Sequence, residues 1–252
     1  MVSPPLLFLA VVFVVGVIVW ARALATVLHG PPTPYPPLVT RYGTAAGEPV
    51  NWELADAPKQ VFQHARAANQ SELRERAERE MVALGGELPP IVPTEDPEMV
   101  GELTAALDAY AAAGAVLDEA RTIPDVVGAL VLVRLGRDAM ERARALRDAR
   151  EVPTATPLCF FNPLHGDAAR WLSWRLLQQD DEVQVLLCER CAGDVRAWHP
   201  PEVLTDEVDG SQVPYFEVPA AQSLWSATGY NVFGGDLVER VLRGEHRRGQ
   251  AG

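Results

Sequence analysis

The chain has 252 residues, of which 48% are hydrophobic, and this composition excludes a wholly disordered protein. Its 34 acidic residues outnumber 22 basic ones, so the net charge of −12 argues against the basic surface of a nucleic-acid-binding protein. Lys59, in DAPKQ, is the single lysine, which excludes the Gly-Lys phosphate loop of Walker NTPases.

Residues 1–30 are predicted to form a transmembrane anchor. Apolar sequence runs from Leu6 past Arg22 to Leu28, and a helix of this length spans about 34 Å, enough to cross a bilayer core. A cleaved signal peptide is the alternative, because ARA and ALA motifs follow at 21–25, but the start MVSPP lacks a basic residue. Arg22 and Arg41 on the C-terminal side favour a single-pass protein of the cell membrane with a cytoplasmic soluble part.

A proline-rich linker is expected over 31–52 and a region of three antiparallel helices over 53–150. The linker contains GPPTPYPPLV, which favours an extended polyproline-like conformation. The first helix, from 53 to about 88, has an apolar face formed by Leu73, Ala77, Met81 and Leu84.

The second and third helices each have a sequence signal for their start. Asp96 before Pro97 is a cap for the second helix, and the predicted apolar face comprises Met99, Leu103, Leu107, Tyr110, Gly114 and Leu117. The third helix opens at TIPD and runs to Arg150. Its apolar stretch 126–133 is also compatible with a buried strand, and we interpret it as helix because an amphipathic pattern continues beyond it.

The chain changes character after residue 150, where short alternating runs and turn residues predict an α+β fold. We expect a zinc-binding module over 151–219 and a C-terminal helix and tail over 220–252. One hairpin is predicted from 169–177 and 182–187, and another around Asp209-Gly210, a strong hairpin signal. Most of the aromatic residues here are expected in the core.

Three cysteines and one histidine in this module form a candidate metal site. Cys159 and His165 lie in CFFNPLHG, and Cys188 and Cys191 lie in CERC beyond the first hairpin. Cys3His is one of the usual ligand sets of structural zinc. Asn162-Pro163 is a turn former that can bring the first pair together, and a helix starting at the second pair favours thiolates.

The order of turn, hairpin and ligand-bearing helix start resembles the treble-clef zinc finger, and the segments that carry this resemblance are CFFNPLH and CERCAGDV. CFFNPLHG followed by a hairpin and CxxC also resembles uncharacterised membrane-anchored proteins of high-GC actinobacteria, whose genomes favour arginine over lysine. The resemblance implies a structural zinc site and no particular activity.

Alternatives to this site remain open. The cysteines can be structural thiols or form a disulfide, CERC can be a redox pair, and Cys159 can be a nucleophile with His165 or His199 as base. His199 is interpreted either as an exposed loop residue or as a replacement for the fourth ligand. The acidic run 180–182 is interpreted as a solvated turn.

Four available ligands favour a closed, structural zinc over a catalytic one, which keeps a position open for water. HExxH, HxE and GxSxG motifs are missing. Residues 153–204 carry four Arg and seven acidic residues, a net charge of −3, so we expect a protein partner and no nucleic acid. The predicted function is a membrane-anchored interaction or scaffolding element without catalytic residues; the alternative is a membrane-tethered zinc-dependent hydrolase.

Overall fold

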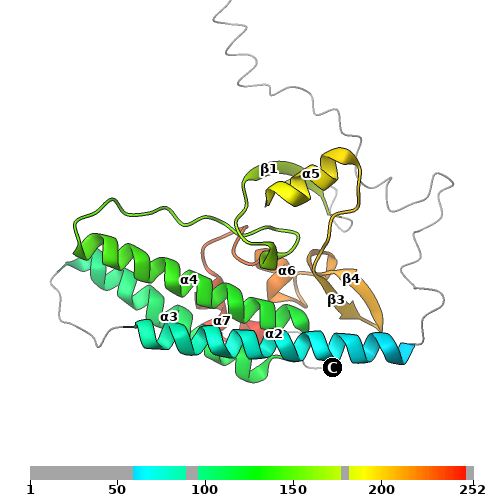
Figure 1. Ribbon diagram of the computed structural model, residues 1–252, viewed down its shortest axis with the longest axis horizontal. Helices are drawn as coiled ribbons and strands as arrows, with labels where there is room; N and C mark the ends of the chain where they lie inside the picture. Colours follow the sequence, from blue (N-terminus) through cyan, green and yellow to red (C-terminus); the bar gives the residue numbers. More distant parts are fainter. Residues whose placement is uncertain (1–58, 89–95, 177–181, 248–252) are drawn as a thin grey trace, which may run out of the picture. The chain divides into compact units, whose positions relative to one another are not determined.

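The computed structural model describes residues 59–88, 96–176 and 182–247 (Figure 1). The predicted anchor at 1–30 and linker at 31–52 lie outside these residues. Within them, helices combine with two small antiparallel hairpins, which confirms the α+β class.

Three long helices form the first part of the described chain: α2 (Lys59–Glu87), α3 (Pro97–Glu119) and α4 (Ile123–Arg147) (Figure 1). The carboxylate of Asp96 accepts hydrogen bonds from the Glu98 and Met99 amides and caps α3, as predicted. Thr122 and Asp125 cap α4 reciprocally, each accepting from the backbone amide of the other. Both boundaries therefore follow from local sequence.

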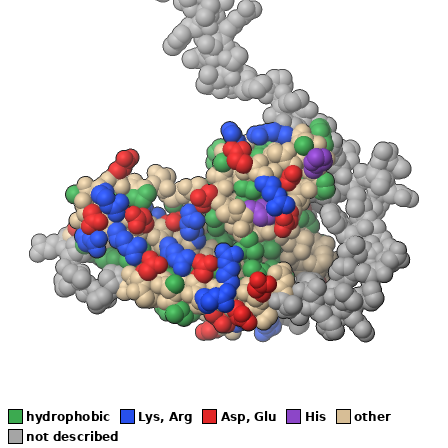
Figure 2. Space-filling view, viewed as in Figure 1, with side chains coloured by type: hydrophobic (Ala, Val, Ile, Leu, Met, Phe, Trp, Pro, Cys, Tyr) green, Lys and Arg blue, Asp and Glu red, His purple; other side chains and the backbone are tan. Residues whose placement is uncertain are grey.

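Ion pairs between the helices show their relative directions. Glu80 and Glu87 on α2 pair with Arg137 and Arg144 on α4, so both helices advance by seven residues in the same direction. On α3, Glu102 pairs with Arg142, whereas Gly136 lies against Ala106 and Ala109, so α3 runs opposite to α4. This up-down-up order matches the predicted antiparallel arrangement. Basic and acidic side chains alternate over the helices in Figure 2.

Small side chains form the buried face of α3. Ala106, Ala109, Ala112, Ala113 and Val116 are at most 1% exposed, whereas Leu107, placed on the apolar face by the sequence, is 40% exposed. A Cβ added to Gly136 of α4 would lie 2.8 Å from the Leu84 side chain and 3.5 Å from Ala109 Cβ. The helices thus approach closely because this face consists mainly of alanine. The sequence-based prediction missed this face because it relied on large apolar residues.

The apolar stretch at the start of α4 is helical, as predicted, and Val126 to Val133 are all buried. A helix covered all round needs partners on both sides. One of them is Trp225, on the short helix α6 (Leu224–Thr228), whose indole approaches Gly128 and whose Nε1 donates a 2.9 Å hydrogen bond to Asp125. Tyr230 stacks on this indole and donates to the carbonyl of Pro124. The C-terminal segment therefore completes the core around α4.

Both predicted hairpins are present. Strand β1 (Arg170–Arg175) pairs with β2 (Glu182–Leu187), and β3 (Thr205–Val208) pairs with β4 (Ser211–Pro214). Asp209 and Gly210 have φ angles of 50° and 77°, as expected for a two-residue turn with both residues in the left-handed region. Helix α5 (Glu189–Ala197) follows β2, and α7 (Leu237–Leu242), the predicted final helix, packs against α3. The short 3₁₀ turns are η2 (Pro163–His165), η3 (Tyr215–Glu217) and η4 (Glu245–Arg247).

Among the described residues, α3 is the one helix long and apolar enough to cross a membrane. Core helices of soluble proteins share this length and composition, and α3 packs its alanine face against α4 while Asp108 is exposed midway along it. Val100 and Leu107 of the same helix are exposed, so the packing accounts only for the buried alanine face.

Candidate metal centre

The first two ligand candidates lie on a tight loop between Leu158 and Asp167, which form an isolated antiparallel bridge. Within the loop, the Cys159 amide donates to the carbonyl of Gly166. The side chain of Asn162 accepts from the Leu164 amide and starts turn η2, which ends in His165. Gly166 leaves the turn with a φ of 83°, a conformation that favours glycine. The sequence NPLHG thus folds His165 back toward Cys159.

The other two candidates lie at the start of α5. Cys188 is the N-cap of this helix, and its Sγ accepts a 3.4 Å hydrogen bond from the Cys191 amide. The helix begins between the two cysteines, so their side chains face the same side. Hydrogen bonds from the Phe160 and Ala169 amides to the carbonyls of Leu186 and Leu187 attach the first loop to the end of β2. The hairpin thereby brings two distant sequence motifs together.

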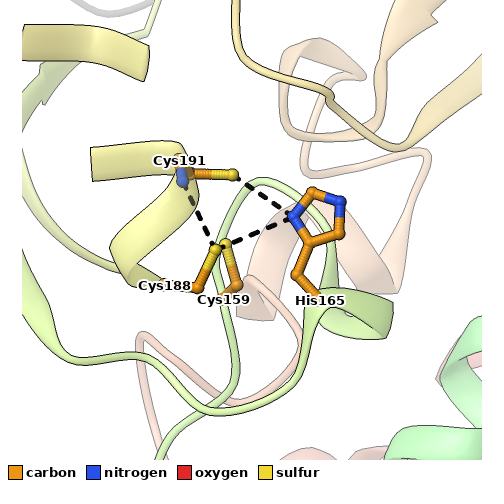
Figure 3. A group of neighbouring side chains, drawn as sticks. All are labelled: Cys159, His165, Cys188 and Cys191. Carbon is orange, nitrogen blue, oxygen red and sulfur yellow. Dashed lines mark hydrogen bonds between the residues drawn. The ribbon is translucent and has the colours of Figure 1, made fainter. Parts of the chain in front are cut away.

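Cys159, His165, Cys188 and Cys191 converge, with one ligand atom from each lying within 4.8 Å of the others. Figure 3 shows the three sulfur atoms and the ring nitrogen Nδ1 of His165 directed toward a common centre. Nδ1 is 3.2 Å from the Cys191 sulfur and 3.9 Å from the Cys188 sulfur. The three cysteines are buried, and the His165 side chain is 12% exposed.

A hydrogen bond between the Cys159 and Cys191 thiols moves their pKa values in opposite directions. A hydrogen bond from the Cys191 thiol lowers the pKa of Cys159 to about 4, although burial acts in the opposite direction. The same hydrogen bond to Cys159, together with burial, raises the pKa of Cys191. Of these two thiols, Cys159 therefore loses its proton more readily, and a metal ion that binds both sulfurs has to displace the proton of Cys191.

The donor set fits a tetrahedral zinc ion. Zinc–ligand bonds of about 2.3 Å to sulfur and about 2.0 Å to nitrogen put tetrahedral ligand atoms about 3.5 to 3.8 Å apart. The nitrogen–sulfur distances of 3.2 and 3.9 Å bracket this value. Thiolate and imidazole ligands also favour zinc, whereas magnesium and calcium prefer oxygen ligands. The residues present thus form a possible Cys3His metal site.

Several alternatives suggested by the sequence can be compared with this geometry. The cysteines are free, so the described residues contain no disulfide. His199 is exposed and lies outside the convergent group. Of the acidic run, Asp180 and Asp181 lie outside the described residues, and Glu182 opens β2 and pairs with Arg175 at 3.5 Å.

The cluster adjoins an aromatic core that begins directly after Cys159. Phe160 and Phe161 are fully buried, and the Phe161 ring lies 4.6 Å from Trp174 and 5.8 Å from Phe216. The Tyr215 hydroxyl donates a 2.6 Å hydrogen bond to the carbonyl of Phe160. The expectation that most aromatic residues of this region lie in the core is met by Trp174, Tyr215, Phe216, Trp225 and Tyr230, whereas Trp171, Trp198 and Phe233 are exposed. The backbone of the metal-site loop is attached to this core.

Glu202 was not among the residues predicted from the sequence, and its carboxylate approaches the far side of the His165 ring at 3.7 Å. Nothing in HPPEVL marks this residue as part of a site. The described residues also contain a cavity of about 270 Å³ lined by Leu176, Phe216, Phe233 and neighbours, and none of the four cluster residues lines it.

The chain matches no protein-family model, no curated protein and no solved structure. The structure itself shows an α+β protein with a buried cluster of three cysteines and one histidine that is suited to a metal ion.

Proposed function

We propose that this chain is a membrane-anchored protein whose Cys3His cluster binds a structural zinc ion, and that the zinc-organised module binds another protein. The observation that carries the proposal is the convergence of four ligand atoms, from two motifs 23 residues or more apart, to within 4.8 Å in a buried position. Unligated thiols gain little from such a grouping, whereas a metal ion uses all four donors.

The order of elements supports a treble-clef-like module. A ligand-bearing turn at 159–165 precedes the β1–β2 hairpin, and α5 then supplies two ligands from its first turn. The zinc would join the turn to the helix across the hairpin. A two-stranded hairpin by itself is only marginally stable in water, which gives a structural metal a physical purpose here.

A protein partner is favoured by the charges and the exposed tryptophans of this module. The net charge of −3 over 153–204 opposes binding to phosphates. Trp171 on β1 is 61% exposed, and Trp198 at the end of α5 is 38% exposed. Trp198 also has a φ of 65°, which is uncommon for a bulky residue. Tryptophan is enriched among the residues that dominate protein interfaces.

Metal analysis of the full-length protein, purified in detergent without added chelator, tests the zinc site. We expect one zinc ion per chain, with three sulfur ligands and one nitrogen ligand by X-ray absorption spectroscopy. A zinc ion with an oxygen ligand in place of one protein donor would instead support a membrane-tethered hydrolase, because a catalytic zinc keeps a water ligand. A metal-free protein would refute the site altogether.

The anchor at 1–30 is tested separately by washing membranes at alkaline pH. A retained transmembrane helix keeps the protein in the pellet, and the mature chain keeps residues 1–30 by mass spectrometry. Release of a shortened chain into the supernatant would show that the segment is a cleaved signal peptide.

A further inference from the structure

The His165 ring has one nitrogen directed at the sulfurs and one directed away from them. Nδ1 faces Cys188 and Cys191, so this atom is the metal ligand candidate (Figure 3). The other nitrogen, Nε2, is buried and makes no hydrogen bond. When Nδ1 binds a metal ion, the neutral ring carries its proton on Nε2, and a buried N–H group without an acceptor is costly.

The carboxylate of Glu202 lies beside this nitrogen, with Oε2 at 3.7 Å. This distance is slightly longer than a hydrogen bond, and a small rotation of the half-exposed Glu202 side chain closes it. The same carboxylate oxygen lies 3.1 Å from the guanidinium of Arg190, which stands between Cys188 and Cys191 in CERC. Arg190 and His165 thus face the same carboxylate oxygen beside the cluster.

The backbone keeps Glu202 in this place. Two residues further on, the Leu204 amide donates to the carbonyl of Phe161, and the Leu204 carbonyl accepts from the Tyr215 amide. The loop after α5 is therefore attached to the core next to the ligand-bearing turn. Glu202 is held near His165 by this attachment, independently of its own side-chain contacts.

We propose that Glu202 is the positioning residue of the metal site: its carboxylate accepts a hydrogen bond from the Nε2–H group of His165 and fixes the ring with Nδ1 toward the metal. This inference rests on the proposed zinc site. A carboxylate in this role selects the correct tautomer and makes the imidazole a stronger ligand. The metal site thereby extends to the loop after α5, since Glu202 and Arg190 connect that loop to His165 and to CERC.

Zinc affinity of full-length Glu202→Gln, measured by competition with a chromophoric chelator, tests the role. The substitution keeps the size of the side chain but removes its charge, and we expect about tenfold weaker zinc binding, as for other outer carboxylates. Glu189→Gln is the matched control, because Glu189 lies in the first turn of α5 and pairs with Arg170 at 2.9 Å, away from His165. Like Glu202→Gln, this control removes one negative charge, here next to Cys188 in the sequence. It should leave the zinc affinity unchanged.

Nuclear magnetic resonance of the ¹⁵N-histidine-labelled, zinc-loaded protein gives a second measurement that loop stability alone would not change. We expect His165 to carry its proton on Nε2, with a downfield proton signal that moves upfield in Glu202→Gln and not in Glu189→Gln. A ring bound to zinc through Nε2, or equal affinities in the two variants, would refute the role of Glu202 while leaving the zinc site intact. Failure of the unsubstituted protein to bind zinc would refute both.

Discussion

Cys188→Ser separates the proposed metal-binding role of this residue from its structural role as a helix cap. The Cys188 sulfur accepts the Cys191 amide proton at the start of α5. Serine is among the preferred N-cap residues, so its hydroxyl can accept the same hydrogen bond. The substitution therefore keeps the helix start and removes one proposed zinc ligand, so a loss of zinc-dependent stability reports on metal binding.

The size of the effect follows from the linkage between binding and folding. A ligand that binds only the folded protein stabilises it by about 2.7 kcal/mol at a free concentration 100 times its dissociation constant, and by about 4.1 kcal/mol at 1,000 times. With zinc buffered at the first level, the unsubstituted protein should gain about 2.7 kcal/mol over the chelator-treated sample. Cys188→Ser offers three of the four ligands, and its gain under the same conditions should fall close to zero.

Urea unfolding of the full-length protein in detergent measures both values. Tryptophan fluorescence reports mainly on the C-terminal half, where Trp171, Trp174, Trp198 and Trp225 lie, and circular dichroism reports mainly on α2, α3 and α4. We expect the variant to lose stability in the first signal and to keep most of its helical signal. An equal zinc-dependent gain in Cys188→Ser and in the unsubstituted protein would show that Cys188 is not a ligand.

Two further predictions concern the packing of the C-terminal segment on the helices. A Cβ at Gly128 would lie 2.2 Å from the Trp225 ring, so Gly128→Ala should lower the unfolding free energy by about 1 to 3 kcal/mol. The control Gly101→Ala places its Cβ in open space on α3 and should raise the unfolding free energy by up to about 1 kcal/mol. Similar urea midpoints for the two variants would contradict this prediction. Two hydrogen bonds of 2.7 Å from Arg247 hold the pKa of Glu119 below its ordinary value of 4.5. The ion pair between Glu119 and Arg247 therefore stabilises the fold above about pH 4.5, and this stabilisation is lost as the pH falls through the lowered pKa of Glu119. The difference in urea midpoint between Glu119→Gln and the unsubstituted protein should accordingly disappear in acid. A pH-independent difference would argue against the pair.

Much of the local structure could be predicted because its signals are local. Asp96 and Thr122 cap their helices with their own side chains, and Asp209-Gly210 adopts the φ angles that its residue types favour. The four ligand candidates could be named because cysteine is rare in this chain and the three copies fall within 33 residues. For these features the residues that decide the structure lie close together in the sequence.

The buried face of α3 and the role of Trp225 could not be predicted in this way. The sequence does not show which helix the alanines of α3 and the glycines of α4 contact, because small side chains pack only where two helices approach closely. Trp225 and Asp125, which form a hydrogen bond, are 100 residues apart in the sequence. Here the contact energy depends on shape and distance between separate segments, which residue type alone does not encode.

The candidate metal centre likewise has features that the sequence predicts and features that only the tertiary structure shows. Residue chemistry and spacing by themselves determined which side chains are suited to hold zinc, because thiolate and imidazole are its preferred ligands at any position in a fold. Only the tertiary structure decided that β1 and β2 bring the two motifs to within 4.8 Å, and that Glu202 faces the remaining nitrogen of His165. The physical reason is that coordination and hydrogen bonding act over a few ångströms in space, while the sequence separates these groups by up to 43 residues.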